Sequence, residues 1–161
     1  MISNICATIG KGISALTVRK YAAEGDLELA RNIFKCVGET VVVQEIHLDA
    51  ITGLSGSGPA YIFMLIDALA DADVNMGLWR EHARTLATQT VLGAAAMVKE
   101  LPDHPAALKD KVASPGGTTI AGLHAMAVAG VYGAMMNAVA AATERARVLG
   151  EIAEKAFLEE S

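Results

Sequence analysis

The sequence predicts a mainly α-helical protein with a small strand–helix–strand piece at its N-terminus. Of the 161 residues, 53% are hydrophobic but only 4% are aromatic, so the apolar side chains are mostly small and aliphatic, as in closely packed helices. Short β-branched runs are concentrated in the first 45 residues, and long segments with helical patterning follow. We therefore predict two parts, residues 1–45 and residues 46–161.

The N-terminal part contains two short runs typical of strands, residues 13–18 and 40–43, with a helical segment at residues 26–37 between them. The helical spacing comes from Leu27, Ala30, Ile33 and Phe34. Two strands and one helix seldom form an independent sheet. Residues 1–45 are therefore predicted to be the remnant or edge of a larger α/β domain.

Five helices are predicted in the second part, because Pro and Gly punctuate its apolar segments at helix boundaries. They run from about Ser57 to Gly77, from Trp79 to Glu100, from Pro105 to Val112, from Thr118 or Thr119 to Gly130, and from Val131 to Glu159. Residues 53–58 read GLSGSG and superficially resemble a dinucleotide fingerprint, but they follow no strand. We interpret them as a flexible, tightly packed link between helices.

No Asp, Glu, Lys or Arg occurs between Lys111 and Glu144. This length raises the question of a membrane span, but the segment contains Pro115 and Asn137 and is rich in Ala, Gly and Met rather than Leu and Phe. A uniformly apolar helix is otherwise buried in a core or in an oligomer interface. The first half of the last helix should therefore be buried, and we predict a homodimer, or a larger oligomer of dimers, with no membrane partner.

Charge and cysteine content exclude other classes of function. The net charge of −5 argues against binding to nucleic acid, and no metal spacing joins the two cysteines or the four histidines, which we expect to be solvated or satisfied in the core. Asp67, Asp71 and Asp73 are interpreted as a solvated surface rather than a cation site. With no leader pattern before Cys6, the simplest prediction is a reduced, cytoplasmic protein without a metal.

The segment at residues 114–123, SPGGTTIAGL, is the strongest candidate for a binding site. A Gly-rich turn that enters a helix through two hydroxyl residues leaves several backbone N–H groups unpaired, where the helix dipole also favours negative charge. A carboxylate or phosphate would bind there. The alternative is an ordinary helix start capped by Ser114 or Thr118, although capping does not require two glycines.

Several blocks resemble the pyrroline-5-carboxylate reductase family. They are TGLSGSGPAY at residues 52–61, ALADADVNMGL at 68–78, HPAALKD at 104–110 and SPGGTTIAGL at 114–123. Together the resemblance covers roughly residues 38–150. In that family an NAD(P)H-binding domain precedes a helical domain that forms the dimer. The resemblance therefore implies the helical dimerisation and substrate-binding half of an enzyme that reduces 1-pyrroline-5-carboxylate to L-proline in proline biosynthesis.

The resemblance also implies site residues. The substrate carboxylate would bind Ser114, Gly116, Gly117, Thr118 and Thr119, and the catalytic residue would be Thr119, with its hydroxyl near the imine nitrogen. Asn4 matches a family position near the cofactor, and both neighbouring family prolines are replaced, by Ser3 and Cys6. Ala127 stands where the family usually has an acidic or amide residue. The intact enzyme would use NAD(P)H, and we expect none to bind this chain alone.

Three interpretations stay open at this point. The chain is a separated part of a working reductase, a diverged non-catalytic homodimer that binds a small carboxylate, or a purely structural domain. We favour reductase ancestry with little or no activity of this chain in isolation.

Overall fold

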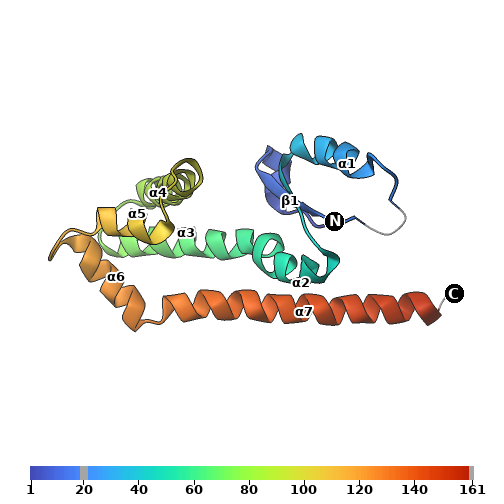
Figure 1. The fold of residues 1–161 in the computed structure, drawn as a ribbon. Coiled ribbons are helices and arrows are strands. Elements are labelled where there is room, and N and C mark those ends of the chain that lie inside the picture. The colour runs from blue at the N-terminus through green and yellow to red at the C-terminus, as the bar shows by residue number, and fades with distance from the viewer. Residues whose placement is uncertain (19–21, 160–161) are drawn as a thin grey trace. The chain divides into compact units, whose positions relative to one another are not determined.

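The fold is described for residues 1–18 and 22–159 in a computed structural model (Figure 1). Two compact units are present. The first consists of Met1–Tyr61 with Met135–Ser161, and the second of Ile62–Ala134. Each unit is considered by itself below.

The first unit contains the only two strands of the described residues. Strands β1 (Gly12–Leu16) and β2 (Gly38–Val42) pair in parallel, with Gly12 opposite Gly38, and α1 (Asp26–Lys35) packs against both of them (Figure 1). This confirms the predicted strand–helix–strand order. Ala15 and Leu16 of β1 are buried, whereas Val41 and Val42 of β2 are 43% and 47% exposed. Such apolar exposure is expected of a sheet that continues beyond two strands.

Helices make up most of the rest of the chain. They are η1 (Ile5–Ile9), η2 (Glu45–His47), α2 (Leu48–Ile51), η3 (Thr52–Gly56), α3 (Gly58–Asn75), α4 (Arg80–Glu100), α5 (Pro105–Val112), α6 (Thr118–Val128) and α7 (Val131–Glu159). The mainly helical fold class is confirmed, and the five predicted helices occur close to their predicted bounds. One interpretation is wrong: most of the GLSGSG segment is a π-helical turn, η3, rather than a flexible link.

The second unit has a core made mainly of alanine. Ala70 of α3 and Ala83 and Ala87 of α4 are buried together, with Ile66 and Val74 packed against them. Methyl groups at such positions let two helix axes approach closely. The core is small, because the described residues contain only six buried hydrophobic side chains in all. These are Ala15, Leu16, Ala70, Ala83, Ala87 and Leu108.

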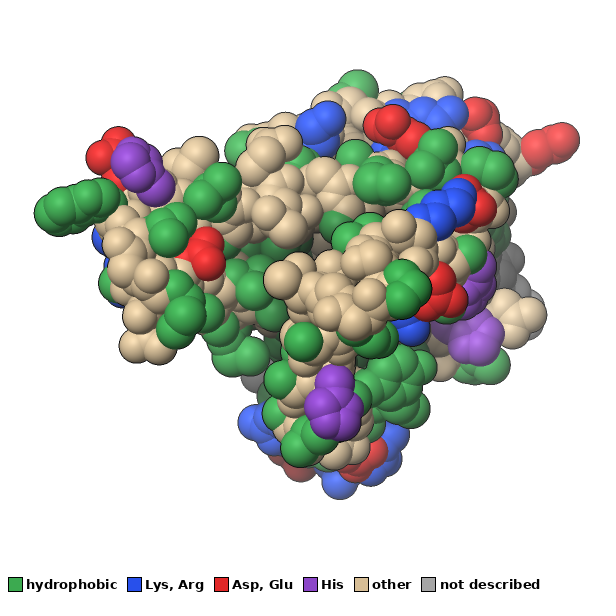
Figure 2. All heavy atoms as spheres, turned by 90° about the vertical axis from the view of Figure 1, so that its left-hand side faces the viewer, with side chains coloured by type: hydrophobic (Ala, Val, Ile, Leu, Met, Phe, Trp, Pro, Cys, Tyr) green, Lys and Arg blue, Asp and Glu red, His purple; other side chains and the backbone are tan. Residues whose placement is uncertain are grey.

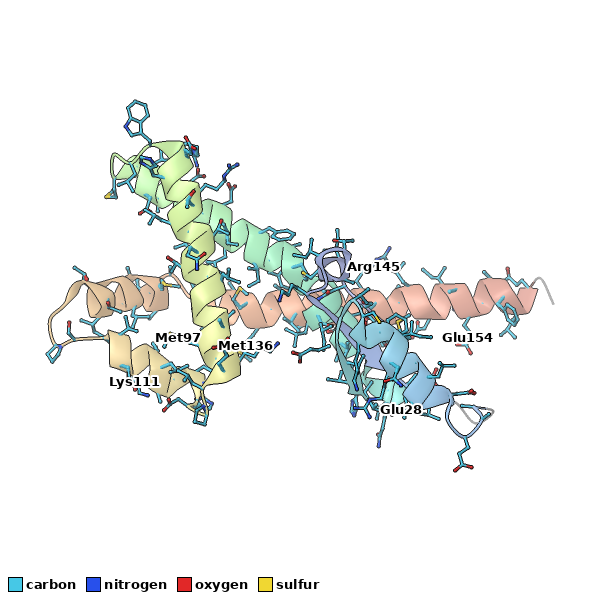
Figure 3. The ribbon with its side chains drawn as sticks, turned by 90° about the horizontal axis from the view of Figure 1, so that it is seen from above. Glu28, Met97, Lys111, Met136, Arg145 and Glu154 are labelled. Carbon is cyan, nitrogen blue, oxygen red and sulfur yellow. The ribbon has the colours of Figure 1, made fainter. Side chains whose placement is uncertain are left out.

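Helix α7 has an uncharged half and a charged half. Met136 belongs to the uncharged half, whereas Arg145 and Glu154 belong to the charged half (Figure 3). In the charged half Arg147 pairs with both Glu144 and Glu151, and its hydrogen bond lowers the pKa of the Glu144 carboxyl below its ordinary value.

The predicted burial of the first half of α7 is not met within one chain. No described residue of α7 is buried, and Tyr132 and Met136 are 82% and 62% exposed. Exposed hydrophobic side chains are also visible on the face of the molecule shown in Figure 2. These side chains are left exposed by the described residues of their own unit.

Taken singly, no described helix has both the length and the apolar composition of a membrane span. Only α6 and α7 together, as a bent pair, meet that test.

Candidate functional site

The predicted anion-binding turn connects α5 to α6. Gly117 is the N-terminal cap of α6, and its N–H donates a hydrogen bond to the Ser114 carbonyl at 3.1 Å. The preceding Gly116 has a φ of +66°, which lies in the left-handed region that side chains rarely adopt. This turn therefore needs a glycine at position 116 for conformational reasons.

Gly117 lies in a tight environment for a different reason. A Cβ at this position would lie 2.2 Å from the Ser114 Oγ, which is far below a van der Waals contact. The Ser114 side chain thus occupies the space beside residue 117. The double glycine that distinguishes this segment from an ordinary helix cap has a structural explanation at each position.

Several hydrogen-bond donors converge at the start of α6. The first helical bond beyond the cap runs from the Ala121 N–H to the Gly117 carbonyl at 3.4 Å, so the N–H groups of residues 118–120 have no backbone acceptor among the described residues. Nor do the hydroxyls of Ser114, Thr118 and Thr119 hydrogen-bond to any described residue. The first turn also has no acidic residue. Such a helix start attracts an anion.

The five predicted substrate-binding residues therefore lie together on one turn. Ser114, Gly116 and Thr118 are exposed, whereas Gly117 and Thr119 are half-buried. An open turn of this kind is accessible to a small ligand.

Two interactions stabilise α5, the helix before the turn. The sequence patterns predict no role for the residues that form them. His104, predicted to be merely solvated or core-satisfied, caps α5 by accepting a hydrogen bond at its Nδ1 from the Ala106 N–H at 3.2 Å. The Lys111 ammonium, at the end of α5, lies 2.8 Å from Asp103 Oδ2. The signal for the cap is present in the sequence, because a polar residue directly before a Pro at the first helical position is typical of a helix start.

Asn4, the predicted cofactor contact, lies in the first unit. Its Nδ2 donates a hydrogen bond to the Ser55 carbonyl at 3.1 Å. Its Oδ1 is buried and has no hydrogen-bond partner among the described residues. The amide nitrogen is therefore already engaged within the protein, and only the oxygen remains free to accept.

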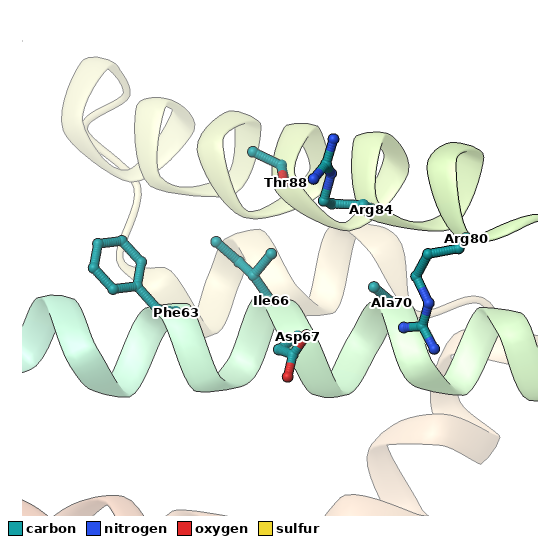
Figure 4. A pocket seen from close by; sticks show the side chains of 7 residues that line it. All are labelled: Phe63, Ile66, Asp67, Ala70, Arg80, Arg84 and Thr88. Atoms are coloured by element: carbon teal, nitrogen blue, oxygen red, sulfur yellow. The ribbon is translucent and has the colours of Figure 1, made fainter.

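A separate pocket of about 320 Å³ lies between α3 and α4 of the second unit (Figure 4). Apolar groups dominate its lining, which consists of Phe63, Ile66, Asp67, Ala70, Arg80, Arg84 and Thr88. Arg80 forms an ion pair with Asp71. None of the predicted substrate-binding residues lines this pocket.

The described residues contain no group of three or more His, Cys, Asp or Glu side chains that could hold a metal ion. Asp67 and Asp71 are exposed, and Asp73 is half-buried.

Comparison with known proteins identifies the family. Residues 45–149 match the family model described as pyrroline-5-carboxylate reductase dimerisation. The chain is 50% identical over 151 residues to a pyrroline-5-carboxylate reductase of Methanosarcina acetivorans, covering 94% of this chain and 56% of the relative. It is 48% identical over 151 residues to the enzyme of Arabidopsis thaliana, covering 94% and 55%. The chain thus spans about half the length of the curated relatives it matches.

Solved structures agree with the sequence comparison. A pyrroline-5-carboxylate reductase from Coxiella burnetii has a TM-score of 0.88 at 35% identity, covering 92% of this chain and 55% of that one. The Plasmodium falciparum pyrroline carboxylate reductase, solved with NADP bound, has a TM-score of 0.86 at 34% identity, covering 92% and 61%. Sequence and fold together show that this chain belongs to the pyrroline-5-carboxylate reductase family.

Proposed function

We propose that this chain supplies the substrate-binding and dimerisation half of an NAD(P)H-dependent reductase that converts 1-pyrroline-5-carboxylate to L-proline, in the cytoplasm. The observation that carries the proposal is the turn from Ser114 to Thr119. Its unpaired N–H and hydroxyl donors, its two adjacent glycines and the absence of a carboxylate in the first turn of α6 fit a small carboxylate.

The role of each residue follows from its chemistry. The carboxylate would accept hydrogen bonds from the backbone N–H groups at the start of α6 and from the hydroxyls of Ser114 and Thr118. The Thr119 hydroxyl would lie near the ring nitrogen. Reduction of the imine adds a hydride to carbon and a proton to nitrogen, so a hydroxyl fixed at the nitrogen orients the ring and stabilises charge there. The contribution of this turn is therefore orientation.

The residues of this chain do not fit the phosphates of a nicotinamide dinucleotide. Such a cofactor places its pyrophosphate on a Gly-rich turn at a helix start within a β–α–β unit. Here α1 begins with Asp26 and Glu28, and Asp26 already accepts a hydrogen bond from the Ala23 N–H at 2.8 Å. We assign cofactor binding to residues that the longer relatives carry outside the matched region. Asn4 remains a proposed cofactor contact of the complete protein.

The proposed partner is a second copy of this chain. The matched family model describes a dimerisation domain, and it covers the uncharged segment between Lys111 and Glu144. The exposed Tyr132 and Phe63 are apolar groups that a second copy would cover. We propose a homodimer, or an oligomer of such dimers, with residues 46–161 as its helical part and residues 1–45 as the edge of the nucleotide-binding domain.

Titration of the chain with proline, measured by calorimetry, tests the substrate site. We expect millimolar binding that Thr119→Ala weakens about tenfold (~1.4 kcal/mol), the effect of removing a hydrogen bond to a charged or polar ligand group. Thr85→Ala is the control, because the Thr85 hydroxyl donates only to the Glu81 carbonyl within α4. Equal affinity of the wild-type and Thr119→Ala chains would contradict the proposal.

A second candidate function is a diverged homodimer that binds a carboxylate without reducing it. It is favoured by Ser3 and Cys6, which stand where the family has prolines next to the proposed cofactor contact. Proline binding by a complete protein that shows no reduction of 1-pyrroline-5-carboxylate would support this alternative.

A further inference from the structure

The π-helical turn η3 leaves backbone carbonyls without their usual donors. The Ser57 N–H donates to the Thr52 carbonyl at 2.9 Å, a spacing of five residues instead of four. The Gly53 carbonyl therefore loses the donor that an α-helix would provide. Carbonyls released in this way must find partners elsewhere or remain unsatisfied.

The Ser55 carbonyl lacks a local donor because of the sequence that follows. In an α-helix its donor would be the N–H of residue 59, but Pro59 has none. The next N–H, that of Ala60, donates to the Ser57 carbonyl at 3.0 Å. The side-chain amide of Asn4, 51 residues away in the sequence, donates to the Ser55 carbonyl at 3.1 Å instead.

The Gly53 carbonyl connects the same turn to α7. It accepts a hydrogen bond from the Tyr61 hydroxyl at 3.2 Å, and the Ala138 carbonyl of α7 is a second acceptor at 3.4 Å. Gly53 is buried, and a Cβ there would lie 2.3 Å from Thr143 Oγ1 and 2.8 Å from the Val139 carbonyl. The turn is thus in direct contact with α7.

The segment that carries Asn4 is fixed to the sheet on its other side. Ile2 and Ala15 exchange two backbone hydrogen bonds of 3.0 and 2.8 Å, and the buried Ser14 hydroxyl donates to the Ser3 hydroxyl at 2.9 Å. A continuous set of hydrogen bonds therefore runs from β1 through Asn4 and the π-helical turn to α7.

We propose that Asn4 is a positioning residue that couples the N-terminal β–α–β piece to α7 through the π-helical turn. A π-helical turn differs from an α-helical turn by one residue of register, so its geometry depends on partners that satisfy the released carbonyls. The inference rests on the proposed function in one respect, namely that a nucleotide-binding domain is attached to the sheet. Displacement of that domain would be transmitted to α7, the helix proposed to pack against the second copy.

Amide hydrogen exchange of the 161-residue chain tests the coupling. Asn4→Ala should accelerate exchange about tenfold at residues 138–143 of α7, which Asn4 does not contact, because loss of its bond leaves a half-buried carbonyl unsatisfied. Thr8→Ala is the matched control, since it removes a hydrogen bond from the same N-terminal segment, to the Ile5 carbonyl at 2.8 Å, but lies outside the connection between β1 and α7. It should leave exchange in α7 unchanged.

Pro59→Ala provides a rescue. It returns an N–H to the position that an α-helix would use to satisfy the Ser55 carbonyl, so the double variant with Asn4→Ala should restore slow exchange in α7. Effects of Asn4→Ala confined to residues 1–16 and 52–60, or equal acceleration by Thr8→Ala, would overturn the proposal.

If Asn4→Ala does not fold, Tyr61→Phe tests the same connection from its other end. Because coupling is reciprocal, this variant should accelerate exchange at Ile2 and Ala15, which Tyr61 does not contact. Unchanged exchange there would contradict the coupling. None of these measurements involves substrate or cofactor, so they can fail or succeed independently of the reductase proposal.

Discussion

The two adjacent glycines of the turn between α5 and α6 meet different physical conditions. Gly116 adopts a positive φ, whereas a Cβ at Gly117 would displace the Ser114 hydroxyl. The sequence alone suggests that two glycines exceed the needs of a helix cap, but it cannot assign a cause to each. The close approach of Ser114 depends on the folded turn, and no local pattern encodes it.

Gly117→Ala should force the Ser114 hydroxyl to rotate out of the space beside residue 117 and should therefore destabilise the protein by about 1 kcal/mol. Urea unfolding measures this change, and proline titration should show a parallel loss of binding. Gly122→Ala is the control, because Gly122 lies within α6 and a Cβ added there would have no neighbour within 4 Å. It should raise stability by about 0.5–1 kcal/mol. Equal effects of the two substitutions would refute the steric argument.

The helices illustrate how far local sequence patterns determine structure. The ends of α4, α5 and α7 agree with the predictions because Pro, Gly and polar caps act over one turn of chain. The prediction of a flexible link at GLSGSG is wrong because the π-helical geometry depends on Asn4 and Tyr61, whose hydrogen bonds complete the turn from outside it. The cap formed by His104 is detectable from the proline that follows it, although solvation is the default expectation for a lone histidine.

Helix α7 should form part of the interface through its uncharged half. Met136→Glu places a charge on that half and should convert the dimer to a monomer, as measured by light scattering at micromolar concentration, because an unpaired charge is costly to bury. Leu158→Glu is matched to it, since Leu158 is 68% exposed and Met136 62%, but it lies in the charged half. We expect Leu158→Glu to remain dimeric. A monomeric wild-type chain would contradict this prediction.

For the whole molecule, the positions of the donor groups and of the acidic residues say more about ligand binding than the net charge of −5 does. The turn that fits a carboxylate lies on the helical second unit, whereas the β–α–β piece has acidic residues where a dinucleotide would need a Gly-rich turn. Sequence patterns locate both features because each is local. They do not predict the exposure of α7, because an uncharged segment alone does not show which surface covers it.

The chain by itself should not bind NADPH. The acidic start of α1 should repel the phosphates of the cofactor. Quenching or enhancement of NADPH fluorescence, measured at micromolar protein concentration, checks this expectation. The Plasmodium falciparum relative, solved with NADP bound, serves as the positive control. Micromolar affinity of this chain for NADPH would show that the assignment of cofactor binding to other residues is wrong.

The small alanine-rich core has a consequence for how the protein folds. Six buried hydrophobic side chains, four of them alanine, remove little apolar surface from water for a chain of this length. In the proposed homodimer, contact between copies would supply further driving force, so that association stabilises the fold. Calorimetric scans should accordingly show a melting temperature that rises with protein concentration.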